Sequence, residues 1–210
     1  MIILFGSGQS RSFRALWALE ESGLEYEYRH VVIGSPKQNG SQSEQYKQLN
    51  FQGKVPSIKH GDSVINESSA ILNYIATLSS DINLIPTDLA SRAYYDEVCS
   101  FVISDLEQPL WTYGKHTFAI PKELRVSDVL PVTHWEFNKS LKALNNYVKD
   151  KEFVVGSHFT MADILICHTL NWAEAFKFEV PDNLLAYKER MYARPACLKA
   201  LKKIDPAKFI

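Results

Sequence analysis

Three serines lie close together near the start of the chain, in the stretch Gly6-Ser-Gly-Gln-Ser-Arg-Ser12. This stretch follows an apolar run and precedes a helical pattern, so we expect it to join a strand to a helix N-terminus. Free amides and the helix dipole at such an end favour an anion, and a serine hydroxyl beside them could donate to a thiolate. An ordinary cap with a glycine turn accounts for at least one of the serines. The spacing fits neither a P-loop, a full dinucleotide-binding pattern nor a Gly-x-Ser-x-Gly elbow.

A proline inside a short apolar run, Lys54-Val-Pro-Ser-Ile58, marks a second candidate site. Proline cannot donate a ladder hydrogen bond, so Pro56 belongs at a strand start or on an edge strand. If the Val55–Pro56 bond is cis, the backbone of Val55 becomes available to a peptide-like ligand that binds as an added strand. The alternative is an ordinary trans proline, because only about 5–6% of X–Pro bonds in folded proteins are cis.

The polar group Asn66-Glu-Ser-Ser69 opens the next helical pattern. A helix N-terminus can hold a carboxylate through its free amides. The hydroxyl of Ser68 would add a donor, and Glu67 could accept a hydrogen bond from an ammonium group. Together they could hold an α-amino acid by both charged groups, although a plain helix cap would use the same residue types.

The pattern of elements changes after about residue 80. Before it, the order β-α-β and then β-β-α predicts a parallel pair followed by an antiparallel hairpin in one small sheet. After the polar linker Asp81–Asp88 the chain reads as helical, and Phe159-Thr-Met-Ala-Asp-Ile164 predicts a capping box with a hydrophobic staple. The expected strands are 2–5, 26–33, 55–58 and 63–66, and the expected later helices are 89–111, 122–148 and 160–176 with two shorter ones through 201. We therefore predict domains at 1–80 and 88–210.

The composition narrows the classes of function. A formal net charge of −1 and a pI of about 6.6 give no basic excess for a nucleic-acid partner. No stretch approaches the roughly 20 apolar residues that span a bilayer, and the N-terminus does not resemble a secretion signal. Three scattered cysteines indicate neither a disulfide framework nor a zinc site, so we expect a cytoplasmic protein without a bound metal.

Taken together, the motifs resemble those of the cytosolic glutathione S-transferase family, and in particular its serine-type, theta-like bacterial members. The matching stretches, in order, are SGQSR, GKVPSI, NESSAI, FTMADI and RPACLKAL. The resemblance implies an α/β thioredoxin-like N-terminal domain followed by an all-α C-terminal domain. It also implies glutathione as co-substrate, no permanently bound cofactor, and a homodimer.

The resemblance assigns roles in the first domain. Ser7 matches the residue that activates the thiol of glutathione, with Ser10 and Ser12 as alternatives. Val55, next to the cis-proline position Pro56, matches the residue that pairs with the cysteinyl backbone. The other expected glutathione-binding residues are Glu67 and Ser68 for the γ-glutamyl end, and Lys54 and Gln52 for the glycine carboxylate. The loop 34–43 lacks the His-Lys pair that some relatives use.

The resemblance also points to residues in the second domain. Asp105 matches an acid that reaches across a dimer to the partner's γ-glutamyl amine, although a solvated edge of an apolar stripe would also place an acid there. Trp111, Tyr113 and His116 could form an apolar wall for the second substrate, although such aromatics are more often core. His116 has no second metal ligand at i+3 or i+4.

The expected activity is that of a glutathione transferase of the EC 2.5.1.18 type, which joins the glutathione thiolate to a small apolar electrophile in detoxification. Peroxidase or dehalogenase chemistry, and a non-catalytic glutathione-binding regulatory protein of the same fold, are the alternatives. A nucleic-acid or translation-associated module is disfavoured, because the basic residues form no cluster. Disulfide exchange is excluded as well, since it needs a sulfur nucleophile and no cysteine precedes Cys99.

Overall fold

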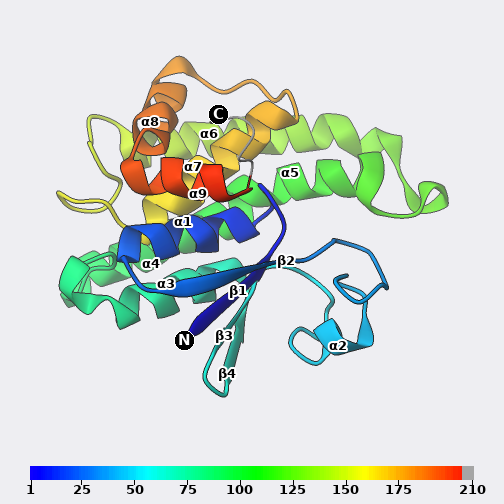
Figure 1. The fold of residues 1–210 in the computed structure, drawn as a ribbon. Coiled ribbons are helices and arrows are strands. Elements are labelled where there is room, and N and C mark those ends of the chain that lie inside the picture. The colour runs from blue at the N-terminus through cyan, green and yellow to red at the C-terminus, as the bar shows by residue number, and fades with distance from the viewer. Residues whose placement is uncertain (205–210) are drawn as a thin grey trace. The chain divides into compact units, whose positions relative to one another are not determined.

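The computed structural model describes residues 1–204 of the chain and divides them into two compact units. The first unit comprises residues 1–85 together with 192–204, and the second comprises residues 86–191 (Figure 1). The helix over residues 195–204 therefore belongs to the first unit. Compact units and sequence domains need not share boundaries, so the domain limits at 1–80 and 88–210 stay a prediction.

The first unit is built on a four-stranded mixed sheet. Its strands are β1 (Ile2–Gly6), β2 (Tyr26–His30), β3 (Ser57–His60) and β4 (Ser63–Asn66), in the order β2-β1-β3-β4. The β1–β2 pair is parallel, whereas β1–β3 and β3–β4 are antiparallel, as the sequence predicted. The predicted bounds of β3 were too early, because the ladder starts only at Ser57, after the proline.

Two helices of this unit, α1 (Ser12–Ser22) and α3 (Ser68–Leu78), pack against each other and contact the sheet. The expected apolar face of α1 is fully buried, and Gly23 ends this helix with a left-handed conformation, φ 67°. The short helix α2 (Glu44–Lys47) was not predicted, because one turn is too short to show a periodic pattern. The thioredoxin-like fold of the first unit is thereby confirmed.

The second unit is helical throughout its regular structure. Its elements are α4 (Leu89–Phe101), a π-helical turn (Val102–Leu106), α5 (Glu107–Gly114), a second π-helical turn (Lys115–Ala119), α6 (Leu130–Val148), α7 (Met161–Ala175) and α8 (Asp182–Tyr192). The predicted helix over 122–148 is wrong before Leu130, where only two 3₁₀ turns occur. Pro131 explains the later start, because proline lacks an N–H and is tolerated only in the first helical turn.

The N-terminus of α7 carries the predicted capping box. Thr160 accepts a hydrogen bond from the backbone of Asp163, and the Asp163 carboxylate accepts one from the backbone of Thr160. Every residue from Met161 to Leu170 is buried, so α7 is the central helix of this unit.

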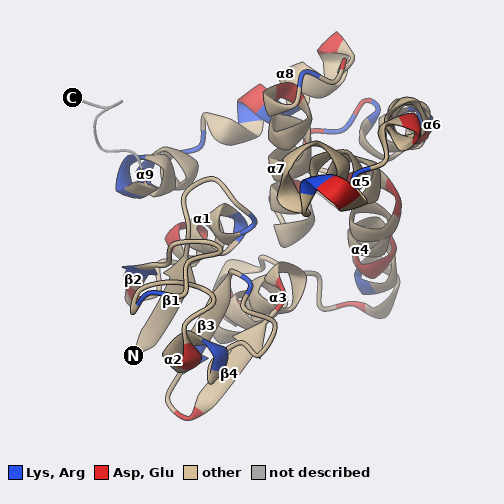
Figure 2. Cartoon of the chain, turned by 90° about the vertical axis from the view of Figure 1, so that its right-hand side faces the viewer, with Lys and Arg blue, Asp and Glu red and all other residues tan. Residues whose placement is uncertain are grey.

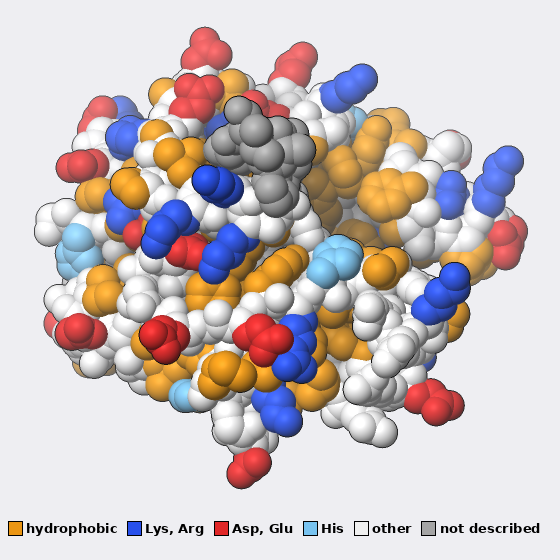
Figure 3. Space-filling model, viewed as in Figure 1, with side chains coloured by type: hydrophobic (Ala, Val, Ile, Leu, Met, Phe, Trp, Pro, Cys, Tyr) orange, Lys and Arg blue, Asp and Glu red, His pale blue; other side chains and the backbone are white. Residues whose placement is uncertain are grey.

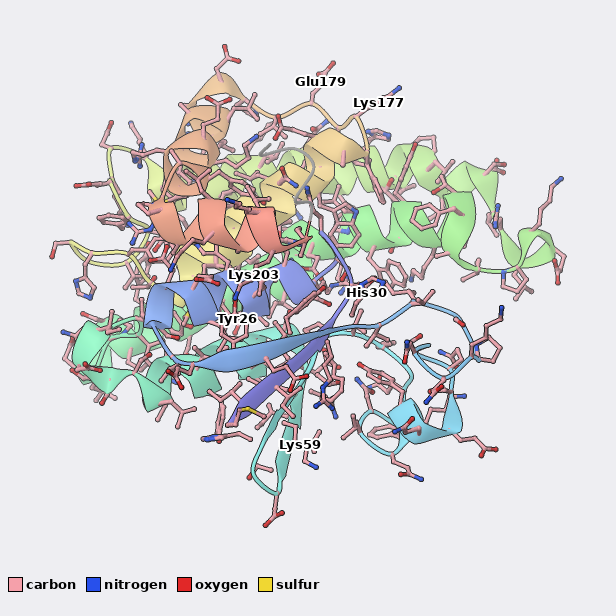
Figure 4. All side chains as sticks on the ribbon, viewed as in Figure 1. Tyr26, His30, Lys59, Lys177, Glu179 and Lys203 are labelled. Atoms are coloured by element: carbon pink, nitrogen blue, oxygen red, sulfur yellow. The ribbon has the colours of Figure 1, made fainter. Side chains whose placement is uncertain are left out.

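The helix α9 (Pro195–Ile204) is held to α1 by ion pairs. Arg194 donates to both carboxylate oxygens of Glu21, at 2.7 and 2.8 Å. Glu20, whose side chain is only 7% exposed, accepts from the ammonium of Lys203 at 3.0 Å and from the hydroxyl of Tyr26. The Lys203 and Tyr26 side chains lie together in Figure 4, and Figure 2 shows basic residues of α9 in blue. The acids of α1 thus hold the basic side of α9.

Replacing Glu20 with glutamine is expected to lower the melting temperature at about pH 7 by roughly 2–4 °C. Burial raises the pKa of Glu20, but hydrogen bonds from Tyr26 and Lys203 and the lysine charges outweigh it and lower the pKa overall. A depressed folded-state pKa stabilises above the unfolded value of about 4.3, and this contribution is lost as the pH falls through the folded-state pKa. Calorimetry over a pH series should show that the difference in melting temperature between wild type and variant becomes smaller as the pH falls.

The matched control is Glu25→Gln, which removes an exposed carboxylate in the same unit. Its melting temperature should follow that of the wild type at every pH. If the melting temperature of Glu20→Gln stays below that of the wild type by the same amount in acid, the charge of Glu20 is not what holds α9.

Candidate functional site

The loop between β1 and α1 is a compact network of serine hydrogen bonds. The hydroxyl of Ser12 accepts from the Ser7 amide at 3.1 Å and from the Ser10 hydroxyl at 2.9 Å. The Ser12 amide in turn donates to the Ser10 hydroxyl at 3.2 Å. The loop approaches α1 so closely that a Cβ on Gly6 would lie 2.7 Å from the Cβ of Ser12, so only glycine fits there. The hydroxyls of Ser10 and Ser12 are therefore already engaged with the loop.

The hydroxyl of Ser7 differs from the other two. Ser7 is half-buried, and its amide and carbonyl both form hydrogen bonds within the loop. Within residues 1–204, no hydrogen bond of its side chain is found. The Ser10 proton is used in the bond to Ser12, and Ser12 is buried, so Ser7 is the candidate serine with a half-buried hydroxyl and no loop hydrogen bond of its own among the described residues.

The segment that leads into β3 contains the predicted cis peptide, between Val55 and Pro56. Val55 precedes the first ladder residue, Ser57, and so lies outside the sheet. The carbonyl of Lys54 is fixed by two buried side chains, the Tyr46 hydroxyl at 2.8 Å and the Asn50 amide at 2.9 Å. The same hydroxyl and amide also contact the buried Ser57 hydroxyl, at 3.1 and 3.2 Å. These hydrogen bonds fix the backbone of the segment that leads into β3. The side chain of Lys54 remains exposed.

The N-terminus of α3 brings together three of the predicted glutathione-binding residues. Glu67 is the N-cap and has φ 66°, a positive value that is uncommon for residues other than glycine. The Gln52 side-chain amide donates to the Glu67 carboxylate at 3.4 Å. Ser68, the first residue of α3, is buried, and its hydroxyl accepts from the Arg14 guanidinium at 3.3 Å. An exposed carboxylate and a buried hydroxyl thus lie side by side at this helix start.

The predicted site residues of the second unit have different surroundings. Asp105 is exposed in the first π-helical turn, where its backbone carbonyl accepts from the Ser140 hydroxyl at 3.0 Å. Trp111 and Tyr113 are half-buried on α5, and Tyr113 packs edge-on against Phe178 at 5.1 Å between ring centroids. The Nδ1 of His116 accepts from the Val126 amide at 3.0 Å. His116 therefore helps to fold its own loop.

Sequence reasoning missed three residues near the first unit's site. Arg14 lies among buried residues on all sides of α1, so no amphipathic pattern distinguishes it. Tyr46 lies on the unpredicted helix α2. The hydroxyl of Tyr28 is buried without a hydrogen-bond partner among the described residues, and its ring lies beside Gly6. Burial raises the pKa of the Tyr28 hydroxyl.

The chain's own thiols are not part of this site. Cys99, Cys167 and Cys197 are all buried, and burial raises the pKa of Cys99 to about 12. No group of three or more His, Cys, Asp or Glu side chains suited to a metal occurs in residues 1–204.

No helix in that range is long and apolar enough to cross a membrane. Figure 3 shows acidic and basic side chains interspersed on the face in view.

Two family models match the chain. The glutathione S-transferase N-terminal domain matches residues 1–77, and the glutathione S-transferase C-terminal domain matches residues 116–195. The first match contains the serine loop, the cis-proline and the start of α3. The chain belongs to the glutathione S-transferase family.

Individual relatives agree with this assignment. Glutathione S-transferase GstA of Escherichia coli O157:H7 is 27% identical over 190 residues, covering 87% of this chain and 89% of the relative. A sphingomonad glutathione S-transferase solved in complex with glutathione is 25% identical, with a TM-score of 0.83 over 98% of this chain and 100% of the other. Elongation factor 1-gamma 3 of Oryza sativa subsp. japonica is 24% identical over 79% of this chain, which spans only 39% of that protein.

Proposed function

We propose that this protein is a serine-type, theta-like glutathione transferase in which Ser7 activates the thiol of glutathione. The observation that supports this most is the Ser7 hydroxyl in the loop that leads into α1: within residues 1–204 it has no hydrogen bond, whereas Ser10 and Ser12 bond each other. A free thiol has a pKa of about 8.5, so only a few per cent is thiolate at neutral pH. A donor hydroxyl and a helix N-terminus would both stabilise the anion and lower that pKa.

Glutathione would lie along the residues that the first unit gathers. Val55, which lies outside the β1–β3 ladder, would pair its backbone with the cysteinyl part, as an added strand pairs with a sheet edge. The exposed carboxylate of Glu67 would accept from the γ-glutamyl ammonium, and Ser68 would donate to the neighbouring carboxylate. Lys54 and Gln52 are exposed on the same segment, and their side chains would bind the glycine carboxylate.

The reaction would be nucleophilic attack by the bound thiolate on a small apolar electrophile. The thiol proton leaves to solvent, the sulfur forms a bond to the electrophilic carbon, and the leaving group departs with its electron pair. Ser7 donates a hydrogen bond throughout and is never deprotonated. Asp105, exposed in the structure, would contact the partner's glutathione in a homodimer. The pocket for the electrophile would be lined by Trp111, Tyr113 and His116. We place this activity in cytoplasmic detoxification.

Two other activities fit the same glutathione site. Peroxidase or dehalogenase chemistry would use the same thiolate on a different electrophile. A non-catalytic glutathione-binding protein would keep Val55, Glu67 and Ser68 without turnover, and the similarity to elongation factor 1-gamma makes that outcome worth testing.

The test is calorimetric titration of the protein with glutathione, followed by assays with an activated aryl chloride, a hydroperoxide and a haloalkane. Saturable binding together with conjugation of the aryl chloride is the expected result. Binding without turnover of any of the three would favour the non-catalytic protein. Failure to bind glutathione at millimolar concentration would overturn the proposal as a whole.

A further inference from the structure

Arg14 is a charged side chain in an unusual place. It lies in the first turn of α1 and is only 1% exposed. Burying a guanidinium is costly, so such a group is normally held by specific contacts. One of its contacts is the hydroxyl of Ser68, 54 residues further along the chain, at 3.3 Å from Nη1. The buried cation of α1 thus reaches the start of α3.

This contact fixes the polarity of the Ser68 hydroxyl. A guanidinium has five N–H donors and no acceptor, so the oxygen of Ser68 must be the acceptor in the pair. The hydroxyl proton of Ser68 then points away from Arg14 and can be donated to another group. That group has to be an acceptor, such as a carboxylate oxygen, and cannot be an ammonium. Without Arg14, the hydroxyl could rotate and accept as readily as it donates.

The charges at this helix start are also arranged in a definite order. Glu67 is exposed and negative, whereas Arg14 is buried and positive behind the neighbouring Ser68. A buried charge is poorly screened by solvent, so its attraction for an anion extends past the hydroxyl. The two charges would favour one orientation of an α-amino acid group, with its ammonium at Glu67 and its carboxylate at Ser68.

We propose that Arg14 is the positioning residue for the carboxylate end of the ligand: it holds Ser68 as an outward donor and adds positive potential behind it. This inference rests on the proposed glutathione site. It adds that a buried residue of α1 that does not touch the ligand acts together with Glu67 to discriminate between the two charged groups of the γ-glutamyl end.

The experiment compares three ligands: glutathione, γ-aminobutyryl-cysteinyl-glycine, which lacks the α-carboxylate, and glutaryl-cysteinyl-glycine, which lacks the amine. Arg14→Met should weaken binding of glutathione and of the glutaryl tripeptide at least tenfold, which is about 1.4 kcal/mol. Binding of the γ-aminobutyryl tripeptide should change by less than twofold. Arg14→Lys, which keeps a buried donor and the charge, should restore most of the lost affinity for glutathione.

The matched control is Arg29→Met, at an exposed arginine paired with Glu27, and it should leave all three affinities unchanged. Should Arg14→Met not fold, arginine side-chain NMR of the wild type replaces it. The Arg14 signals, assigned with Arg14→Lys, should then shift with glutathione and stay in place with the γ-aminobutyryl tripeptide.

Two results would overturn the inference in different ways. Equal losses for the three ligands in Arg14→Met, or equal NMR shifts, would show that Arg14 has only a structural role, while glutathione binding by the wild type would keep the proposed function intact. Absence of glutathione binding by the wild type would remove the proposed function and this inference together.

Discussion

Replacing Asp163 with alanine is expected to lower the free energy of unfolding by about 3 kcal/mol or more, because the carboxylate has four donors around it in a fully buried position. It accepts from the Thr160 amide at 2.7 Å and from the Thr160 hydroxyl at 3.0 Å. It also accepts from the Val154 amide at 3.0 Å and from the Tyr187 hydroxyl. A capping box alone would be worth roughly 1 kcal/mol. The larger effect follows because alanine would leave buried donors of three chain segments unpaired.

The measurement is urea denaturation followed by circular dichroism, which reports the helices that make up the second unit. Asp182→Ala is the matched control, since it removes an acid from the first turn of α8 at an exposed position. The control should change the free energy by no more than a few tenths of a kcal/mol, within the range for surface substitutions. Similar losses in the two variants would mean that the buried network around Asp163 contributes no more than a surface acid.

The elements that sequence reasoning placed well are those whose information is local. The strand Ser63–Asn66 was placed correctly, because a turn with Gly61 at φ 60° and alternating side chains both lie within a few residues. The capping box of α7 is equally local, since its partners lie three residues apart. The predicted start of α6 at residue 122 was wrong, although Pro131 is a local signal for a start near residue 130.

The contacts that sequence reasoning missed depend on packing that leaves no local sequence pattern. Arg14 and Ser68 are 54 residues apart, and only folding brings α1 against α3. The fixed Lys54 carbonyl depends on Tyr46, from a one-turn helix without a detectable pattern. The motif around Val55 and Glu67 indicated where a ligand could lie. The residues that hold that motif in place could be found only from the packed structure.

Replacing Ser7 with alanine is expected to raise the pKa of the bound glutathione thiol by about 2 units, towards its free value of about 8.5. The structure supports Ser7 over its neighbours, because only its hydroxyl is free of loop hydrogen bonds in the described chain. At neutral pH the thiolate fraction, and with it the turnover, should fall roughly 25-fold, from mostly thiolate to a few per cent. Affinity for glutathione should change little, since the γ-glutamyl and backbone contacts stay in place.

The thiol pKa is read from the ultraviolet absorbance of the thiolate in the complex, titrated with pH alongside turnover. Ser10→Ala and Ser12→Ala are the matched controls, each removing a hydroxyl that bonds within the loop. They should lower the melting temperature more than Ser7→Ala does, because the buried Ser12 oxygen accepts from both Ser7 and Ser10. A rise in the thiol pKa for Ser10→Ala or Ser12→Ala, with none for Ser7→Ala, would assign the activating role to Ser10 or Ser12. For Ser10, donation to the sulfur would then require the loop to give up the hydrogen bond that its hydroxyl donates to Ser12.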